Sequence, residues 1–496
     1  MAIPFDNRYA ALGEGFFMRT RPTPVPAPAL IRFNHELALD LGMDPERMEP
    51  EYVARIFSGN EIPEGAEPLA MAYAGHQFGF FTPQLGDGRA ILLGEVTGRD
   101  GRGYEIHLKG SGRTVFSRNG DGRAPLGPVL REYLVSEAMH RLGVPTTRAL
   151  AAVTTGEGVF RDRVLPGAVL TRVAGSFVRV GTFEFHARRG DVEAVRKLAD
   201  HVIGRNYPEL AQSDNRYLAL LEAVVGRQAS LVAKWMGLGF IHGVMNTDNM
   251  SILGETIDYG PCAFMDCFDF DRVYSSIDQH GRYAYSNQPG VGLWNLARLA
   301  ECLALIVDPD MEAAIESVKN ILGGFMPAYE SAWLEGMRAK CGLFRTDGAA
   351  GRPDRRVVDD LLALMAKSGA DFTLTFFLLS SLRDRPAAGD EKFLEQFGPM
   401  ADPVRKWLEE WRAALARQSV GEKRRQEEMR RVNPVYIPRN HLVEAAIRSA
   451  EEDDDYSAFH ELHEVLQIPY ELKRGKERFQ LPPVPEEEVR QTFCGT

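Results

Sequence analysis

Cysteine is scarce in this sequence, and its five cysteines are irregularly spaced (Cys262, Cys267, Cys302, Cys341 and Cys494). This pattern excludes a disulfide scaffold and a regularly spaced zinc site, and it predicts reduced, mostly buried thiols. An excess of basic residues is also missing. The net charge of −11 argues against a general nucleic-acid binder, although local basic clusters can still bind phosphate.

Long apolar runs are absent as well. The longest stretch, around 372–382, is interrupted by Thr and Ser and is too short to cross a bilayer. Residues 1–10 carry Asp6 and Arg8 and have no apolar segment typical of a secretory signal. We therefore expect a cytoplasmic protein without a membrane anchor.

A chain of 496 residues exceeds what one hydrophobic core usually serves, which predicts two lobes. Residues 1–68, rich in proline near their middle, are interpreted as an N-terminal extension that packs as an extended arm. Residues 69–180 are β-rich, and 181–400 are mainly helical. Residues 401–496 predict a C-terminal helical extension, with an acidic run at 451–455 expected to be solvated. The fold class is therefore predicted to be α+β.

Individual elements follow from hydrophobic periodicity and from turn residues. Strands are predicted at 89–96, 104–109, 250–253 and 262–265. Helices are predicted at 34–41, 128–142, 191–203, 217–237, 292–306, 311–322 and 403–431. A sheet lobe, one helix and then a helical lobe is the element order of kinase-like folds.

Two glycines, Gly86 and Gly88, lie in the segment Q-L-G-D-G-R at 84–89, directly before a predicted strand. Glycines allow backbone amides to approach a phosphate closely, and Arg89 adds a permanent cation. A plain hairpin turn is the alternative.

Lys109 ends the predicted strand at 104–109, on the polar side of its alternating pattern. Kinases place the lysine that grips nucleotide phosphates on such a strand. The following helix offers Glu132 and Glu137 as partners that could orient this lysine. They lie about 140° apart around a helix, so only one of them can face Lys109.

The segment H-G-V-M-N-T-D-N at 242–249 is followed nine residues later by D-Y-G at 258–260. Kinase catalytic loops read H-R-D-x-x-x-x-N, and their Asn and the Asp of D-F-G hold the metal ions. The spacing therefore predicts Asn249 and Asp258 as ligands of Mg²⁺, which prefers oxygen donors. Val244 occupies the place of the proton-accepting Asp and cannot accept a proton, so Asp248 is the nearest replacement.

Arg172 and Arg179 stand in apolar, strand-like contexts, where an arginine needs an anion. That anion is either a nucleotide phosphate or the carboxylate of a buried structural ion pair. Asp121, Gly122 and Arg123 lie between Lys109 and the helix and suggest a second polar face around the nucleotide.

These segments resemble the signatures of the selenoprotein O family, and the likeness covers nearly the whole chain. The motifs are Y-A-G-H-Q-F-G at 73–79, P-Q-L-G-D-G-R-A at 83–90, K-G-S-G at 109–112, G-D-G-R at 120–123, H-G-V-M-N-T-D-N at 242–249, D-Y-G-P at 258–261, N-P at 433–434 and I-P-R-N-H at 437–441.

The resemblance implies a divergent, two-lobed kinase-like (pseudokinase) fold that binds ATP in a flipped orientation and transfers AMP to Ser, Thr or Tyr of proteins. Whether the protein is also its own substrate stays open. UMP transfer from UTP with Mn²⁺ is also associated with similar bacterial proteins. The implied nucleotide contacts are Gly86, Gly88, Arg89, Lys109, Asp121, Gly122, Arg172, Arg179 and Asp258. Glu132 is implied as the partner of Lys109, Asn249 and Asp258 as ligands of Mg²⁺ or Mn²⁺, and Asp248 as proton acceptor.

Two other functions stay open at this point: ordinary phosphoryl transfer with Asp248 as base, and a non-catalytic ATP-binding scaffold. The scaffold is disfavoured because both metal-ligand positions are retained. A further hypothesis is redox control by a disulfide from Cys494 to Cys262 or Cys267, the alternative being that Cys494 is a free thiol.

Overall fold

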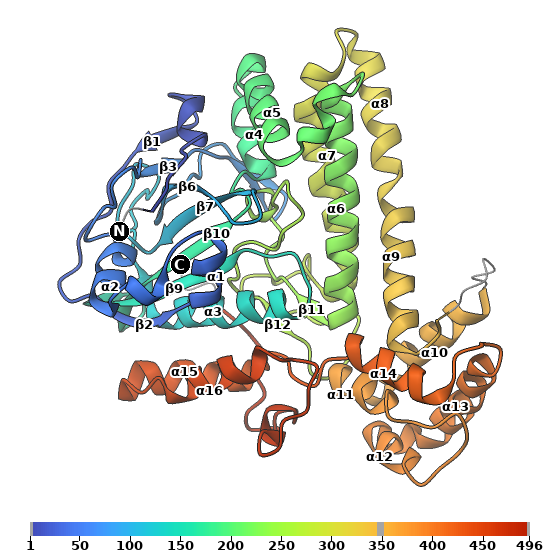
Figure 1. The fold of residues 1–496 in the computed structure, drawn as a ribbon. Coiled ribbons are helices and arrows are strands. Elements are labelled where there is room, and N and C mark those ends of the chain that lie inside the picture. Colours follow the sequence, from blue (N-terminus) through green and yellow to red (C-terminus); the bar gives the residue numbers. More distant parts are fainter. Residues whose placement is uncertain (1–2, 345–351, 494–496) are drawn as a thin grey trace.

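The computed structural model describes residues 3–344 and 352–493, and these form an α+β protein in which a sheet lobe stands beside long helices (Figure 1). The main sheet is antiparallel, in the order β1-β3-β6-β7-β10-β9-β2, with β8 paired to β10. Its strands are β1 (Phe17–Arg19), β2 (Ala29–Phe33), β3 (Leu69–Met71), β6 (Ala90–Thr97), β7 (Gly103–Lys109), β8 (Ala124–Pro125), β9 (Arg148–Phe160) and β10 (Val164–Ala174).

Strands β6 and β7 confirm the strands predicted at 89–96 and 104–109. Alternation along β7 sends Ile106 and Leu108 into an apolar core, as expected. The polar side is buried too, since Glu105 and His107 are both 0% exposed. This face of the sheet therefore needs internal hydrogen-bond partners. Glu105 accepts from Ser176 and from the backbone of Phe177, and His107 bonds to Asp87 and Arg172.

The extended-arm interpretation of residues 1–68 is wrong. Strands β1 and β2 form the two ends of the main sheet order, and the helices α1 (His35–Asp40) and α2 (Pro50–Ser58) pack on the sheet. Phe57 of α2 shares an apolar core with Leu108 of β7 and Val169 of β10. The N-terminal segment is thus part of the sheet lobe.

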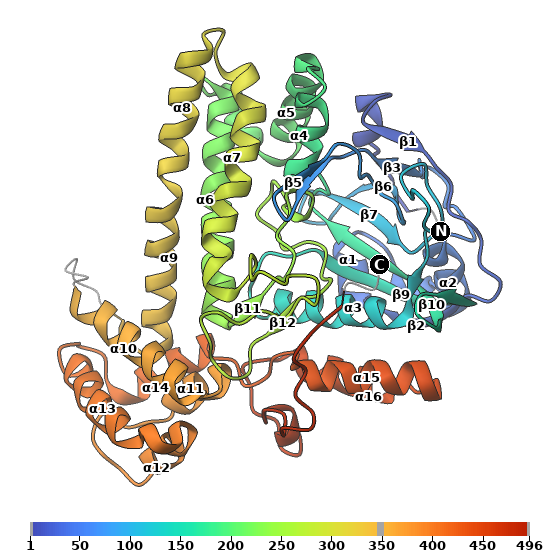
Figure 2. The same ribbon diagram turned by 180° about the vertical axis from the view of Figure 1, so that it is seen from behind.

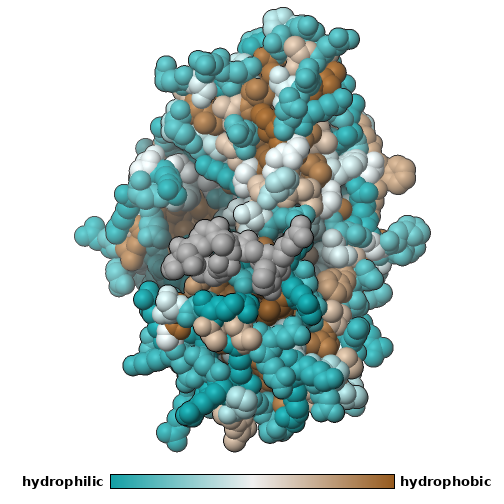
Figure 3. Space-filling model, turned by 90° about the vertical axis from the view of Figure 1, so that its right-hand side faces the viewer, coloured by the Kyte–Doolittle hydropathy of each residue, from teal (hydrophilic) through white to brown (hydrophobic). Residues whose placement is uncertain are grey.

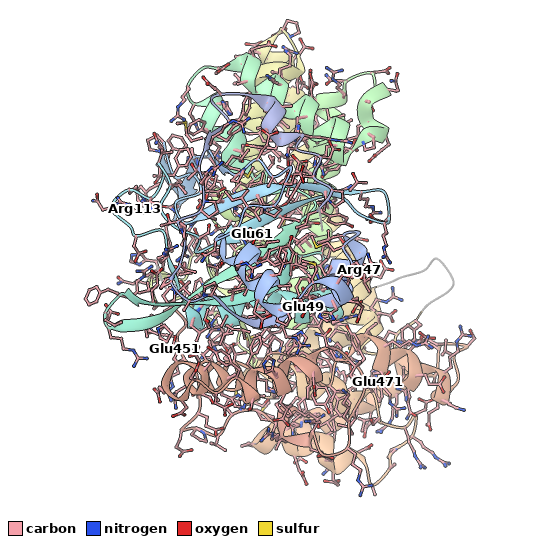
Figure 4. The ribbon with its side chains drawn as sticks, turned by 60° about the vertical axis from the view of Figure 1, so that its left-hand side comes forward. Arg47, Glu49, Glu61, Arg113, Glu451 and Glu471 are labelled. Atoms are coloured by element: carbon pink, nitrogen blue, oxygen red, sulfur yellow. The ribbon has the colours of Figure 1, made fainter. Side chains whose placement is uncertain are left out.

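Helix α3 (Leu126–Arg141) lies between the sheet and the C-terminal helices α15 (Asn440–Asp453) and α16 (Ser457–Leu466), as Figure 1 shows. Apolar side chains of all three helices form one core. Glu451, labelled in Figure 4, accepts a hydrogen bond from the backbone of Gly127 at 3.1 Å. Residues 452–455 are exposed as predicted. Asp455 accepts a hydrogen bond from the backbone of Ser457 at 2.9 Å, so the acidic run is used structurally at both of its ends.

The second lobe is helical: α4 (Val180–Ala187), α5 (Val192–Asn206), α6 (Arg216–Leu238), α7 (Gln288–Val307), α8 (Met311–Gly323), α9 (Phe325–Lys340), α10 (Arg352–Ser368), α11 (Phe372–Leu379), α12 (Asp390–Leu394), α13 (Ala401–Leu415) and α14 (Glu422–Val432). The helices predicted at 191–203, 217–237, 292–306 and 311–322 are confirmed. The single helix predicted at 403–431 is wrong, because α13 ends at Leu415 and Gly421 caps a separate α14. The strand predicted at 250–253 is a loop with one bridge, between Arg179 and Ser251.

The segment Tyr285–Val307, which includes α7, is long and apolar enough by length and composition to cross a membrane. Figure 2 shows α7 among the other long helices, and its Leu296 and Leu303 are fully buried in the core of the lobe. A core helix of a soluble protein passes the same test, so the segment is weak evidence for a membrane span. On the face drawn in Figure 3, hydrophilic and apolar side chains are interspersed.

Candidate active site

A cleft of about 800 Å³ lies between the sheet lobe and the loops around 244–261. Glu132 and Glu137, the two candidate partners of Lys109, are not on the cleft wall. The other candidate site residues line the cleft together: Gly86, Gly88, Arg89, Lys109, Asp121, Gly122, Arg172, Arg179, Asp248, Asn249 and Asp258.

The glycines of the cleft hold two loops in close contact. A Cβ atom on Gly86 would meet the ring of Phe116 at 2.3 Å, and one on Gly88 would meet the carbonyl oxygen of Phe116 at 2.9 Å. Gly122 has φ +73°, and a Cβ atom at this position would overlap the backbone of Gly112. These positions therefore need glycine for packing, whatever ligand the loops bind.

Lys109 points from the end of β7 to Glu132 of α3, with 2.5 Å between Nζ and Oε2. Glu137 lies on another side of α3 and pairs with Arg148 at 2.8 Å. The structure thus resolves the choice left open by the sequence: Glu132, behind the cleft wall, is the partner of Lys109.

Asp258 is the anion at the centre of a buried cationic cluster. Its Oδ1 lies 2.5 Å from Arg172 Nη1 and 3.6 Å from Lys109 Nζ, and its Oδ2 lies 3.1 Å from Arg179 Nη1. Burial opposes ionisation, but Arg172, Arg179 and Lys109 together hold the pKa of Asp258 well below its usual value. Asp258 also has φ +61°, a strained conformation typical of functional positions.

The two arginines reach this cluster from different elements. Arg172 lies on β10 as predicted, whereas Arg179 caps α4 and is not in a strand. Both are buried ion-pair partners of Asp258 and both line the cleft, so the two interpretations of these arginines are compatible. Arg179 also stacks over the ring of Tyr73, with its Cζ atom 4.4 Å from the centroid.

Asp248 lies in the short helix η4 (Thr247–Asn249), deep in the cleft and 7% exposed. Burial raises the pKa of its carboxyl to about 7, and its Oδ1 has no hydrogen-bond partner. A buried polar atom without a partner is uncommon and marks a position where a ligand group can donate. Val244, at the position of the kinase base, has no atom that could do this.

Asn249 and Asp258 supply the kind of oxygen donors that Mg²⁺ and Mn²⁺ prefer. Asn249 donates through Nδ2 to the carbonyl of Val244 at 3.0 Å. The amide oxygen of Asn249 is the atom that would bind a metal. Asp258 is ionised. Within the described ranges no group of three or more His, Cys, Asp or Glu residues is placed to hold a metal. The two donors therefore fit an ion completed by phosphate oxygens and water.

Asp121 has a more exposed position than the other candidates. Its carboxylate pairs with Arg161 at 2.8 Å and accepts a hydrogen bond from the backbone of Arg123. Arg161 also lines the cleft and was not singled out from the sequence. The part of the cleft wall formed by Asp121 and Arg161 therefore carries an acidic and a basic group side by side.

The family follows from comparison with known proteins. The model of the family described as "Protein adenylyltransferase SelO" matches residues 1–467. The chain belongs to the SelO family.

Similar proteins from bacteria carry the name "Protein nucleotidyltransferase YdiU", and three of them illustrate the likeness. The one from Rhizobium meliloti (strain 1021) is 56% identical over 495 residues, covering 100% of both chains. The one from Rhodopseudomonas palustris (strain BisB5) is 56% identical over 507 residues, covering 100% of this chain and 99% of the relative. The one from Bradyrhizobium diazoefficiens is 56% identical over 495 residues, with the same coverage.

His107 of this SelO chain was not singled out either, because its sequence context gave it no role. His107 sits behind the cleft, bonded to Asp87 through Nε2 at 3.0 Å and to Arg172 through Nδ1 at 2.9 Å. Burial lowers the pKa of His107, which suits a neutral ring that accepts from the arginine and donates to the carboxylate. The available signal was a polar residue on a strand otherwise typical of a core.

The disulfide hypothesis cannot be read from the geometry, because Cys494 lies outside the described residues. Cys262 is buried and Cys267 is exposed.

Proposed function

We propose that this chain transfers AMP from ATP to Ser, Thr or Tyr hydroxyls of proteins and releases pyrophosphate. The observation that carries the proposal is Asp248: its side chain lines the same cleft as the cations and its carboxyl has one oxygen without a hydrogen-bond partner, while Val244 stands where a kinase has its base. The names of the relatives, which specify nucleotidyl transfer, point the same way.

A kinase-like arrangement of two lobes is the second part of the proposal. It is supported by the ion pair between Lys109 at the end of strand β7 and Glu132 of helix α3. It is also supported by a catalytic loop and a D-Y-G segment between the lobes. In this arrangement Lys109, Arg172 and Arg179 bind the triphosphate.

The chemistry follows from these placements. Asn249 and Asp258 would hold Mg²⁺ or Mn²⁺, which supplies charge stabilisation at the phosphates. The hydroxyl oxygen of the protein substrate attacks the α-phosphorus, and Asp248 accepts its proton. The bond from the α-phosphorus to the bridging oxygen breaks, and pyrophosphate leaves with the electron pair. The cationic cluster offsets the negative charge of the leaving group.

Parallel reactions with ATP labelled at the α- or the γ-phosphate test the proposal. We expect label on protein, including this chain if it modifies itself, from the α position alone. Intact-protein mass spectrometry then shows addition of AMP, or of UMP when UTP replaces ATP with Mn²⁺. Transfer of the γ label favours the kinase alternative, and metal-dependent binding of ATP without any transfer favours the scaffold.

The arginines give a separate prediction. Arg172→Lys and Arg179→Lys keep the charge but lose the planar fork that binds two oxygens at once. We expect each variant to bind ATP about tenfold more weakly, which corresponds to about 1.4 kcal/mol. Isothermal titration measures this. If both variants bind and turn over ATP normally, these arginines serve only the ion pair with Asp258.

A further inference from the structure

Three buried side chains outside the cleft form a closed ring of hydrogen bonds directly behind Asp248. Thr247 Oγ1 donates to Glu184 Oε2 at 2.5 Å and accepts from the backbone of His76 at 2.7 Å. His76 Nδ1 lies 2.5 Å from Glu184 Oε1, which closes the ring. Their exposed fractions are 0% for Thr247, 1% for Glu184 and 7% for His76.

The ring joins three segments that are far apart in the sequence. His76 belongs to the hairpin of β4 (Gly75–Gln77) and β5 (Phe80–Thr82), Glu184 to α4, and Thr247 to η4. The cleft wall described in the structure includes Asp248 and Asn249 but neither Thr247 nor Glu184. The ring therefore acts on a nucleotide only through its neighbours.

Helix α4 holds the segment around Asp248 at further points. Arg179, at its N-terminus, donates to the backbone carbonyl of Asp248 at 3.0 Å. A Cβ atom on Gly181 would overlap the carbonyl oxygen of Ala74 and would lie 3.3 Å from Asp248 Cα. The backbone of α4 therefore packs directly against the backbone of these two residues. The backbone of Asp248 is thus fixed from one side.

The hairpin fixes the carboxyl group from the other side. A Cβ atom on Gly75 would lie 2.4 Å from Asp248 Oδ1, and Gln77 Nε2 lies 3.4 Å from Asp248 Oδ2. Phe78 N donates to Asn246 Oδ1 at 3.1 Å, just before η4. The ring at His76, Glu184 and Thr247 therefore adds buried hydrogen bonds to the contacts that hold η4 against the hairpin.

We propose that Glu184, Thr247 and His76 are positioning residues that set the Asp248 carboxyl at the acceptor hydroxyl. The inference rests on the proposed function, because it takes Asp248 as the proton acceptor. A misplacement of about 1 Å at a reacting group can cost about 100-fold in rate. Breaking the ring therefore lowers kcat and leaves the affinity for ATP, set by the cationic cluster, nearly unchanged.

Thr247→Val tests this, because valine keeps the branched shape and removes only the hydroxyl. We expect kcat for α-label transfer to fall at least about tenfold and KM for ATP to change by less than about threefold. Thr247→Ser restores the hydroxyl and should recover most of kcat. Thr375→Val is the matched control: Thr375 is equally buried, in α11, and its hydroxyl has no partner to lose.

Unchanged kcat in Thr247→Val, or a loss that Thr247→Ser does not restore, overturns the proposal. A parallel loss of ATP affinity overturns it too, because it indicates a general collapse of the cleft. Should Thr247→Val not fold, Glu184→Gln replaces it, because an amide oxygen can accept only one of the two hydrogen bonds that the carboxylate makes. Full turnover in that variant contradicts the proposal. If the wild type transfers the γ label instead, the proposed function fails, while the same kcat ratio measured with that label still decides the positioning role. A wild type without any transfer overturns both.

Discussion

Asp258→Asn is expected to lower AMP transfer at least about 100-fold. The amide keeps the shape of the carboxylate but removes the charge that binds the metal. The change also removes a negative charge that forms ion pairs with all three cations, Arg172, Arg179 and Lys109. ATP without metal should bind to this variant at least as tightly as to the wild type, because the cluster gains net positive charge. The dependence of binding on Mg²⁺ or Mn²⁺ should disappear.

Titration of ATP with and without metal, alongside the label assay, measures both effects. Breaking a buried ion pair costs about 3–5 kcal/mol, so thermal unfolding must show that the variant is folded at the assay temperature. Asp214→Asn, at an exposed aspartate, is the control for the substitution itself. Near-normal turnover in folded Asp258→Asn would remove the metal assignment.

Asp248→Asn should lower kcat by about 100-fold or more, because an amide oxygen cannot take the hydroxyl proton and general bases contribute factors of this size. ATP affinity and its metal dependence should stay as in the wild type, in contrast to Asp258→Asn. The thermal midpoint should stay the same or rise. Oδ1 of Asp248 has no partner, and burial raises the pKa of the carboxyl, so the charged form is the one that folding disfavours. An amide oxygen can still accept the hydrogen bond from Gln77.

Steady-state kinetics, ATP titration and a melting curve together test this combination. A lower melting temperature with a proportional loss of ATP binding contradicts it, because the residue would then be structural. Normal turnover contradicts it from the other direction, since another group must then accept the proton.

Local patterns predicted the helical lobe well, and the failures have a physical cause in each case. Helix α6 follows from one long amphipathic repeat, which periodicity reveals. The break between α13 and α14 depended on Gly421, a weaker signal than the charged run around it. The segment 250–253 is apolar because it packs against α6, where Gln228 donates to the Ser251 carbonyl, and not because it pairs in a sheet.

The site shows the same division. Spacing within one loop placed Asn249 and Asp258 in a common cleft. The choice between Glu132 and Glu137 depended on how α3 is rotated against β7, which the sequence of the helix does not contain. The ring of His76, Glu184 and Thr247 was invisible for a related reason: its first and last members are 171 positions apart, and no short motif joins them.

The position of the terminal segments in the fold also determines when during synthesis the lobes can close. Strand β2 pairs with β9, so it has no partner until residues near 154 have left the ribosome. The apolar outer face of α3 stays uncovered for longer still, because α15 and α16, which cover it, are synthesised only when the chain is almost complete. A nascent chain of this length therefore carries an uncovered apolar surface for most of its elongation, and such surfaces are what chaperones bind and what aggregates when translation stalls. Chains that terminate early, before about residue 440, should accumulate as insoluble protein even though every cleft residue is present.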